Sequence, residues 1–146
     1  MSAEMHHVSI FVRDLERSLE LFSGLLGLEK VKHLKGVKGR QLSRLLGLAD
    51  FEADMVFLKH PSQHILLELV RQTGGSGDRP WPAGPSGFGL SFVVRDLAGL
   101  HARLAKGGWQ PLSEPLRMPG PDGKPLNLFC FLTEEGFMVE LIEAKG

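Results

Sequence analysis

Two acidic side chains in this sequence stand where a charge is unfavourable unless something neutralises it. Glu68 and Glu140 each lie within an apolar run, residues 65–70 and 137–142, of the kind that forms a buried strand. An ionised carboxylate in such surroundings needs a paired positive charge or a bound cation. A histidine, His7, opens a third apolar run near the N-terminus. These three groups are the first candidates for chemistry.

The elements that must position these groups come from an internal repeat. The nine residues 7–15 match residues 89–97 position for position, an offset of 82 (89 − 7), and five of the nine pairs are identical. The first position of the repeat is His7 in the first copy and Gly89 in the second. Each copy ends at an Asp followed by helical periodicity, and each half closes on one of the acid-bearing strands. The repeat is far longer than a solenoid unit, so it indicates a tandem duplication of one module.

The first module, about residues 5–70, is predicted to contain a strand, a helix and three strands. Asp14 is a suitable N-cap for the helix, and Gly27 follows its last apolar position. The predicted elements are a strand over 6–12, a helix over 15–26, and strands over 28–34, 55–59 and 64–70.

Period-two alternation divides the first strand between two faces. The less apolar face carries His7, Ser9 and Phe11, and it is expected to line the space that the sheet encloses. The other face, expected to pack beneath the helices, carries His6, Val8, Ile10 and Val12.

Residues 35–51 have no counterpart in the second module. Leucines within this insertion suggest a short amphipathic helix, and its basic residues are Lys35, Lys38, Arg40 and Arg44. Two interpretations remain open: a solvated face on a helical flap, or a lid whose cations meet an anionic substrate.

Residues 71–86 are rich in Gly, Pro and Ser and are predicted to link the modules. The second module, about residues 87–143, repeats the order of the first. Its predicted elements are a strand over 88–94, a helix over 97–106, and strands over 109–116, 126–132 and 137–142.

Composition limits the possible partners. The 146 residues fit one domain, with 17 basic and 17 acidic residues and no net charge, which gives no electrostatic case for nucleic acid or an anionic membrane. No apolar run approaches the roughly 18 residues of a membrane span, and the N-terminus lacks a secretion signal. The single cysteine, Cys130, is interpreted as a small core residue and suits a reducing compartment, so a cytoplasmic location is expected.

These motifs resemble the vicinal oxygen chelate superfamily, which includes glyoxalase I, methylmalonyl-CoA epimerase, extradiol dioxygenases, and fosfomycin and bleomycin resistance proteins. The resemblance rests on the His-x-x-Ile-x-Val-x-Asp-Leu opening at 7–15, on Leu-Gly-Leu at 26–28 and on the Glu-Leu pairs that close each module. It implies an α+β fold over residues 1–146: two tandem βαβββ modules that form a curved mixed-sheet half-barrel around a pocket. It also implies a homodimer.

Metal-dependent members of that superfamily place one ligand on the first strand and one on the last strand of each module. Here the resemblance assigns those positions to His7, Glu68, Gly89 and Glu140, so three of the four can bind a metal. One imidazole and two carboxylates suit a divalent ion such as Zn, Ni, Co, Mn or Fe.

Three functions follow from the resemblance, all on a small-molecule substrate or ligand. The first is a metal-dependent lyase or isomerase acting on adjacent oxygens, with Glu140 or Glu68 as the base. The second is a metal-free binding protein of the bleomycin-resistance type, with Trp81 adding flat apolar surface. The third is an extradiol-dioxygenase-like enzyme, although such enzymes usually present two His and one Glu. The residues expected to line the pocket are Ser9, Phe11, Phe57, Gly89, Ser91 and Phe129.

Overall fold

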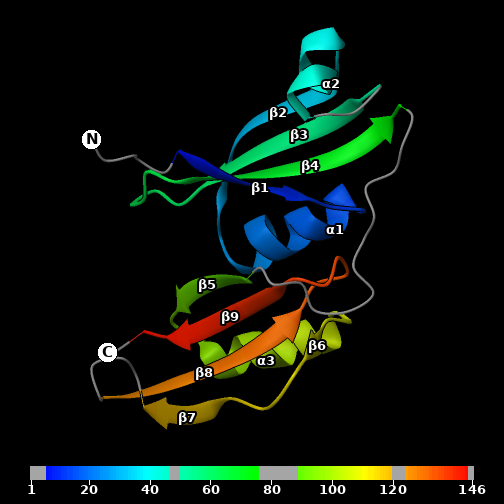
Figure 1. Ribbon diagram of the computed structural model, residues 1–146. Helices are drawn as coiled ribbons and strands as arrows, with labels where there is room; N and C mark the ends of the chain where they lie inside the picture. The colour runs from blue at the N-terminus through cyan, green and yellow to red at the C-terminus, as the bar shows by residue number, and fades with distance from the viewer. Residues whose placement is uncertain (1–5, 47–49, 76–88, 120–123, 145–146) are drawn as a thin grey trace. The chain divides into compact units, whose positions relative to one another are not determined.

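The computed structural model describes residues 6–46, 50–75, 89–119 and 124–144 (Figure 1). It divides into two compact units, Met1–Arg79 and Pro80–Gly146. Each unit contains an open mixed sheet with helix against it. The predicted α+β class with two mixed sheets is therefore confirmed.

Unit 1 contains a four-stranded sheet in the order β1-β4-β3-β2. Its strands are β1 (His7–Phe11), β2 (Glu29–Lys38), β3 (Glu52–Lys59) and β4 (Leu66–Gly74). β1 runs parallel to β4, and the other pairs are antiparallel. Both β2 and β4 continue four residues beyond their predicted ends, because their ends pair with the start of β3. Part of the predicted insertion and part of the predicted linker thus belong to the sheet.

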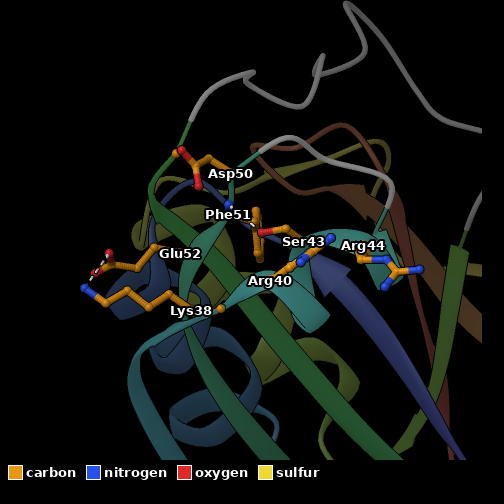
Figure 2. A pocket seen from close by; sticks show the side chains of 9 residues that line it. Lys38, Arg40, Ser43, Arg44, Asp50, Phe51 and Glu52 are labelled. Carbon is orange, nitrogen blue, oxygen red and sulfur yellow. Dashed lines mark hydrogen bonds and ion pairs between the residues drawn. The ribbon is translucent and has the colours of Figure 1, made fainter.

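The insertion forms the predicted short helix, α2 (Arg40–Leu46), after β2. The Oγ of Ser43 accepts a hydrogen bond from the backbone N–H of Phe51 at 3.0 Å, which ties the helix to the start of β3 (Figure 2). Phe51 is buried in a cluster with Ala53, Met55 and Val70. Leu42, from α2, packs against the same cluster, so the insertion is docked on the sheet by an apolar contact.

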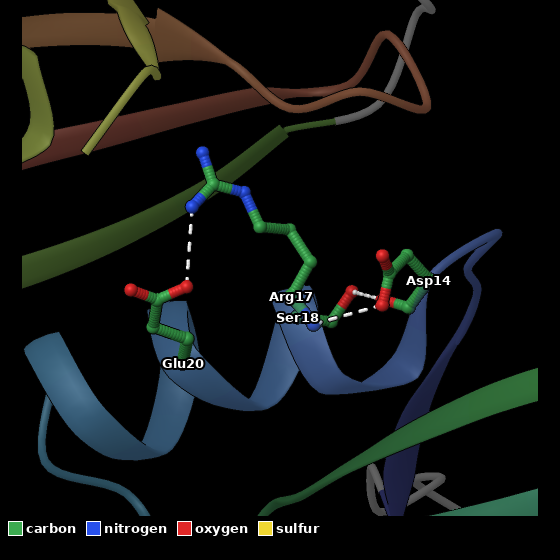
Figure 3. Close-up of polar contacts among 4 residues, drawn as sticks. All are labelled: Asp14, Arg17, Ser18 and Glu20. Carbon is green, nitrogen blue, oxygen red and sulfur yellow. Dashed lines mark hydrogen bonds and ion pairs between the residues drawn. The ribbon is translucent and has the colours of Figure 1, made fainter.

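The first helix begins as α1 (Leu15–Leu19) and continues as the π-helix η1 (Glu20–Leu25), where one helix over 15–26 was expected. The Asp14 carboxylate accepts the N–H of Arg17 at 3.0 Å, and the Ser18 hydroxyl donates to the Asp14 carbonyl at 2.9 Å (Figure 3). An Arg17–Glu20 ion pair of 3.1 Å spans the junction of α1 and η1. Gly27, at φ 75°, lies just past the helix end, as predicted.

The main core of unit 1 lies between this helix and the sheet face that alternation assigned to it. Ile10 and Val12 are buried there, in agreement with the prediction. The other large buried side chains of this layer include Leu15, Phe22, Val56, Leu58 and Leu69. None of the helices in the described part of the chain is long and apolar enough to cross a membrane.

Unit 2 has the sheet order β5-β9-β8-β6, with β7 also paired to β8. Its elements are β5 (Gly89–Val94), α3 (Leu97–Lys106), β6 (Gln110–Pro111), β7 (Leu116–Pro119), β8 (Pro125–Leu132) and β9 (Met138–Glu143). Helix α3 matches the prediction, with Asp96 as its N-cap. The prediction of a single strand over 109–116 is wrong, because two short strands, β6 and β7, pair with opposite ends of β8. Pro111 and Pro115 lack the N–H groups that a continuous ladder would use.

Candidate functional site

His7 and Glu68 lie together on one face of the unit 1 sheet. In the parallel β1–β4 pair, Ser9 is opposite Glu68, so His7 is one alternation away on the same face. The Nε2 of His7 is 3.6 Å from Oε2 of Glu68, and the two side chains are 36% and 13% exposed. The structure therefore brings together two of the three residues to which the resemblance assigned a metal.

The carboxyl group of Glu68 lies in surroundings that disfavour its charge. Burial raises its pKa above the ordinary value, and the nearby His7 opposes that shift only in part. A proton or a cation would each remove the unfavourable negative charge. Such a group can serve as an acid–base residue or as a metal ligand.

His6 also belongs to this cluster, although alternation placed it on the opposite face. Its Nδ1 lies 2.8 Å from Nδ1 of His7, and the rings meet edge to face at a centroid distance of 5.1 Å. His6 precedes β1, so the alternation of a strand does not govern its direction. The contact orients the His7 ring through one nitrogen while its other nitrogen, Nε2, points toward Glu68. The consecutive His6–His7 pair was the only signal of this in the sequence.

Glu140 occupies the matching position in unit 2 but has a different partner. Ser91 lies opposite it in the parallel β5–β9 pair, and the Ser91 hydroxyl donates to Oε1 of Glu140 at 2.6 Å. Gly89, at the place of His7, offers no side chain. A Cβ there would stand 3.3 Å from the carbonyl oxygen of Met138.

Phe129 is not placed as predicted. It is 2% exposed and its ring packs edge to face on His101 of α3, so it belongs to the core beneath the helix. Its neighbour Cys130 pairs with Glu140 across β8 and β9 and shares its face. Adjacent residues of a strand face opposite sides, so only one of the two could line a pocket. Cys130 is half-buried, and both burial and the Glu140 carboxylate raise the pKa of its thiol.

Phe11 lies on the His7 face, as alternation predicts, and Phe57 lies on the same face. Phe57 is opposite Glu68 in the β3–β4 pair, and both rings pack against the buried cluster that contains Phe51. The ring of Phe11 meets that of Phe51 at a centroid distance of 6.3 Å. The insertion therefore covers one end of the face that carries the His7–Glu68 pair. Trp81 lies outside the described residues.

The three candidate ligands are divided between the units: His7 and Glu68 in unit 1, Glu140 in unit 2. Within either unit, the residues that the structure describes contain no group of three His, Cys, Asp or Glu able to hold a metal ion. The donor set itself, a nitrogen ligand and carboxylates beside a desolvated acid, fits a divalent cation.

Comparison with known proteins decides the family. Residues 6–131 match the model of the glyoxalase/bleomycin resistance protein/dioxygenase superfamily. The chain belongs to this superfamily. The resemblance that the sequence motifs predicted is thereby confirmed, and no curated protein matches the chain.

Solved structures of the superfamily share the fold. A glyoxalase family protein from Bacillus cereus superposes with a TM-score of 0.81 at 24% identity, over 100% of this chain and 97% of that one. The trypanothione-dependent glyoxalase I of Leishmania major gives 0.61 at 21% identity, over 97% and 87%. The fosfomycin resistance protein FosX of Listeria monocytogenes, in complex with Mn(II) and sulfate, gives 0.64 at 12% identity, over 99% and 95%. At these identities the superpositions support the fold alone.

Proposed function

We propose that this superfamily member is a divalent-metal-dependent lyase or isomerase that acts on a small substrate with adjacent oxygens. The observation that carries the proposal is the His7–Glu68 contact of 3.6 Å, with Glu68 desolvated on the sheet face. Glu140, at the equivalent register position of the second module, is the proposed third ligand. A divalent ion held by these groups would stabilise negative charge that develops on a substrate oxygen.

The chain's own contribution is proton transfer. Glu68 or Glu140 would take a proton from the carbon next to a carbonyl and return it at the same or a neighbouring atom, which is the chemistry of isomerases and lyases of the glyoxalase or epimerase kind. Desolvation suits Glu68 to this role because it makes the carboxylate a stronger base. The His6–His7 contact would hold the imidazole in place.

The test is metal content by mass spectrometry of tag-free protein, beside Glu140→Gln and a matched control, Glu143→Gln. Glu143 lies on the same strand, and its Oε2 accepts a hydrogen bond from Nδ2 of Asn127. We expect about one ion per chain in wild type and control, and loss in Glu140→Gln. A loaded protein would then be screened with 2-oxoaldehydes, acyl-CoA esters and catechols. No metal in the wild type after reconstitution with Mn, Fe, Co, Ni and Zn would refute the proposal.

A second function, a metal-free binding protein, is favoured by unit 2 taken alone. There Ser91 already satisfies one oxygen of Glu140, and Gly89 supplies no metal-ligating side chain. The same experiment separates the two, because a binding protein would remain metal-free. Saturable binding of aromatic or antibiotic ligands to the metal-free chain would support this second function.

A further inference from the structure

A cavity of about 780 Å³ lies at the end of the unit 1 sheet, where β2 ends, α2 follows and β3 begins. Its volume is in the range of small-molecule sites. The ionisable and hydroxyl side chains that line it are Lys38, Arg40, Ser43, Arg44, Asp50 and Glu52 (Figure 2). None of these residues belongs to the His7–Glu68 pair, so the cavity is a separate place on the molecule.

The charges in the cavity are unevenly paired. Lys38 Nζ lies 3.7 Å from Oε2 of Glu52, so these two largely neutralise each other on one side. Arg40 and Arg44 are exposed and lie one helical turn apart on α2. Neither guanidinium forms an ion pair with any residue that the structure describes. Asp50 is the remaining acid of the lining, so this side has an excess of positive charge.

The walls of the cavity are held by buried contacts. Ser43, only 7% exposed, accepts the backbone N–H of Phe51. Gly75, at φ 110° and directly after β4, lies so close to the residues that precede β3 that an added Cβ would overlap the Asp50 carbonyl. These contacts anchor the backbone of α2, which carries both arginines, against the residues that begin β3, and a preformed backbone lowers the entropy cost of binding a ligand.

We propose that this cavity binds a small molecule that carries a phosphate or carboxylate group, recognised by Arg40 and Arg44. Guanidinium groups bind both oxyanions through paired N–H donors. The two acids in the lining would repel an extended polyanion, which selects for a compact ligand. The site requires no metal, so it stands independently of the proposed catalytic function.

The test uses inorganic phosphate and succinate as probes, with ionic strength held constant by NaCl. Calorimetry and amide NMR would follow the wild type, Arg40→Gln/Arg44→Gln, and the charge-matched control Arg95→Gln/Arg117→Gln in unit 2. We expect saturable binding that shifts the amides of Gly39, Ser43 and Gly75. The α2 double variant should bind about tenfold more weakly and the control within about twofold. The stronger probe identifies the oxyanion class.

Equal loss in the two double variants, or unshifted cavity amides with both probes, would overturn the proposal. A gain-of-affinity variant guards against misfolding: Glu52→Gln removes an acid from the wall and releases Lys38, so phosphate or succinate should bind about threefold more tightly. Weaker or unchanged binding in that variant would also count against the site. Metal content in the α2 double variant should stay unchanged, which separates this site from the catalytic one.

Discussion

The two modules hold a carboxylate at the same register and give it different partners. Glu68 and Glu140 each lie opposite a serine of the neighbouring parallel strand. In unit 1 the carboxylate contacts an imidazole, whereas in unit 2 it accepts a hydrogen bond from Ser91. The imidazole has no counterpart in unit 2, because the second copy has Gly89 where the first has His7. Backbone register is thus shared between the modules, while the chemistry depends on single side chains.

The residues across the next strand pair differ in the same way. Phe57 faces Glu68, and Cys130 faces Glu140. In unit 1 the insertion is also docked on this face, through Phe51. The first module therefore places an aromatic residue opposite its acid, on a face that the insertion partly covers, in keeping with the desolvation of Glu68. Four substitutions test whether these differences determine function.

The largest effect is expected from His7→Gly, which gives the first module the residue of the second. Loss of the imidazole should weaken Mn²⁺ or Co²⁺ binding about 100-fold, equivalent to roughly 2.7 kcal/mol. Calorimetric titration measures this, with His64→Gly, in an exposed turn of the same unit, as control. Unchanged affinity in His7→Gly would exclude His7 as a ligand.

The reverse exchange, Gly89→His, should strengthen metal binding about tenfold if it adds a fourth ligand to the proposed set. Gly89 has no positive φ, and the new Cβ needs only a small shift from the Met138 carbonyl. Gly24→His, placed where a Cβ meets nothing within 4 Å, controls for a surface histidine that binds metal nonspecifically. Equal gains in both variants would mean that the two modules do not share a site.

Glu68→Gln should stabilise the metal-free protein by about 1 kcal/mol at pH 7. Because burial raises the pKa of Glu68 above 4.5, the folded state holds this proton more tightly than the unfolded state. Wild-type stability from this group is therefore present at low pH and is lost as the pH rises through the folded pKa, whereas glutamine does not titrate.

Urea unfolding with EDTA at pH 4, 5.5 and 7 measures this difference. Glu140→Gln keeps an acceptor oxygen for Ser91. It should therefore change the free energy of unfolding by less than about half of the change in Glu68→Gln. A gain for Glu68→Gln that is the same at all three pH values would show that desolvation of the charge is not its cause.

The smallest effect is expected from Ser91→Ala, with Ser9→Ala as its register-matched control. Without the 2.6 Å hydrogen bond, the Glu140 carboxylate becomes a better ligand, and metal affinity should rise about twofold to threefold. Weaker binding in Ser91→Ala would instead assign Ser91 a supporting role at the metal. The same titration as for His7→Gly distinguishes these results.

Features encoded by nearby residues could be predicted from the sequence. Asp14 and Asp96 cap helices through contacts three residues away, and both caps are present in the structure. The alternation of apolar and polar residues correctly predicted that Ile10 and Val12 are buried. Comparison of residues 7–15 with 89–97 revealed the duplication, and the duplication in turn pointed to the superfamily that the family model confirms. These features depend on local periodicity and identity, which a sequence displays directly.

The tertiary structure alone decided which side chains meet. The face of Phe129 depends on how β8 pairs with β9, since a shift of one residue exchanges the two faces. The contact of His6 with His7 depends on where β1 begins. Docking of α2 on the His7 face depends on Phe51 reaching a cluster with Val70 of β4. In each case the partners come from strand pairing or packing, which local sequence patterns do not specify.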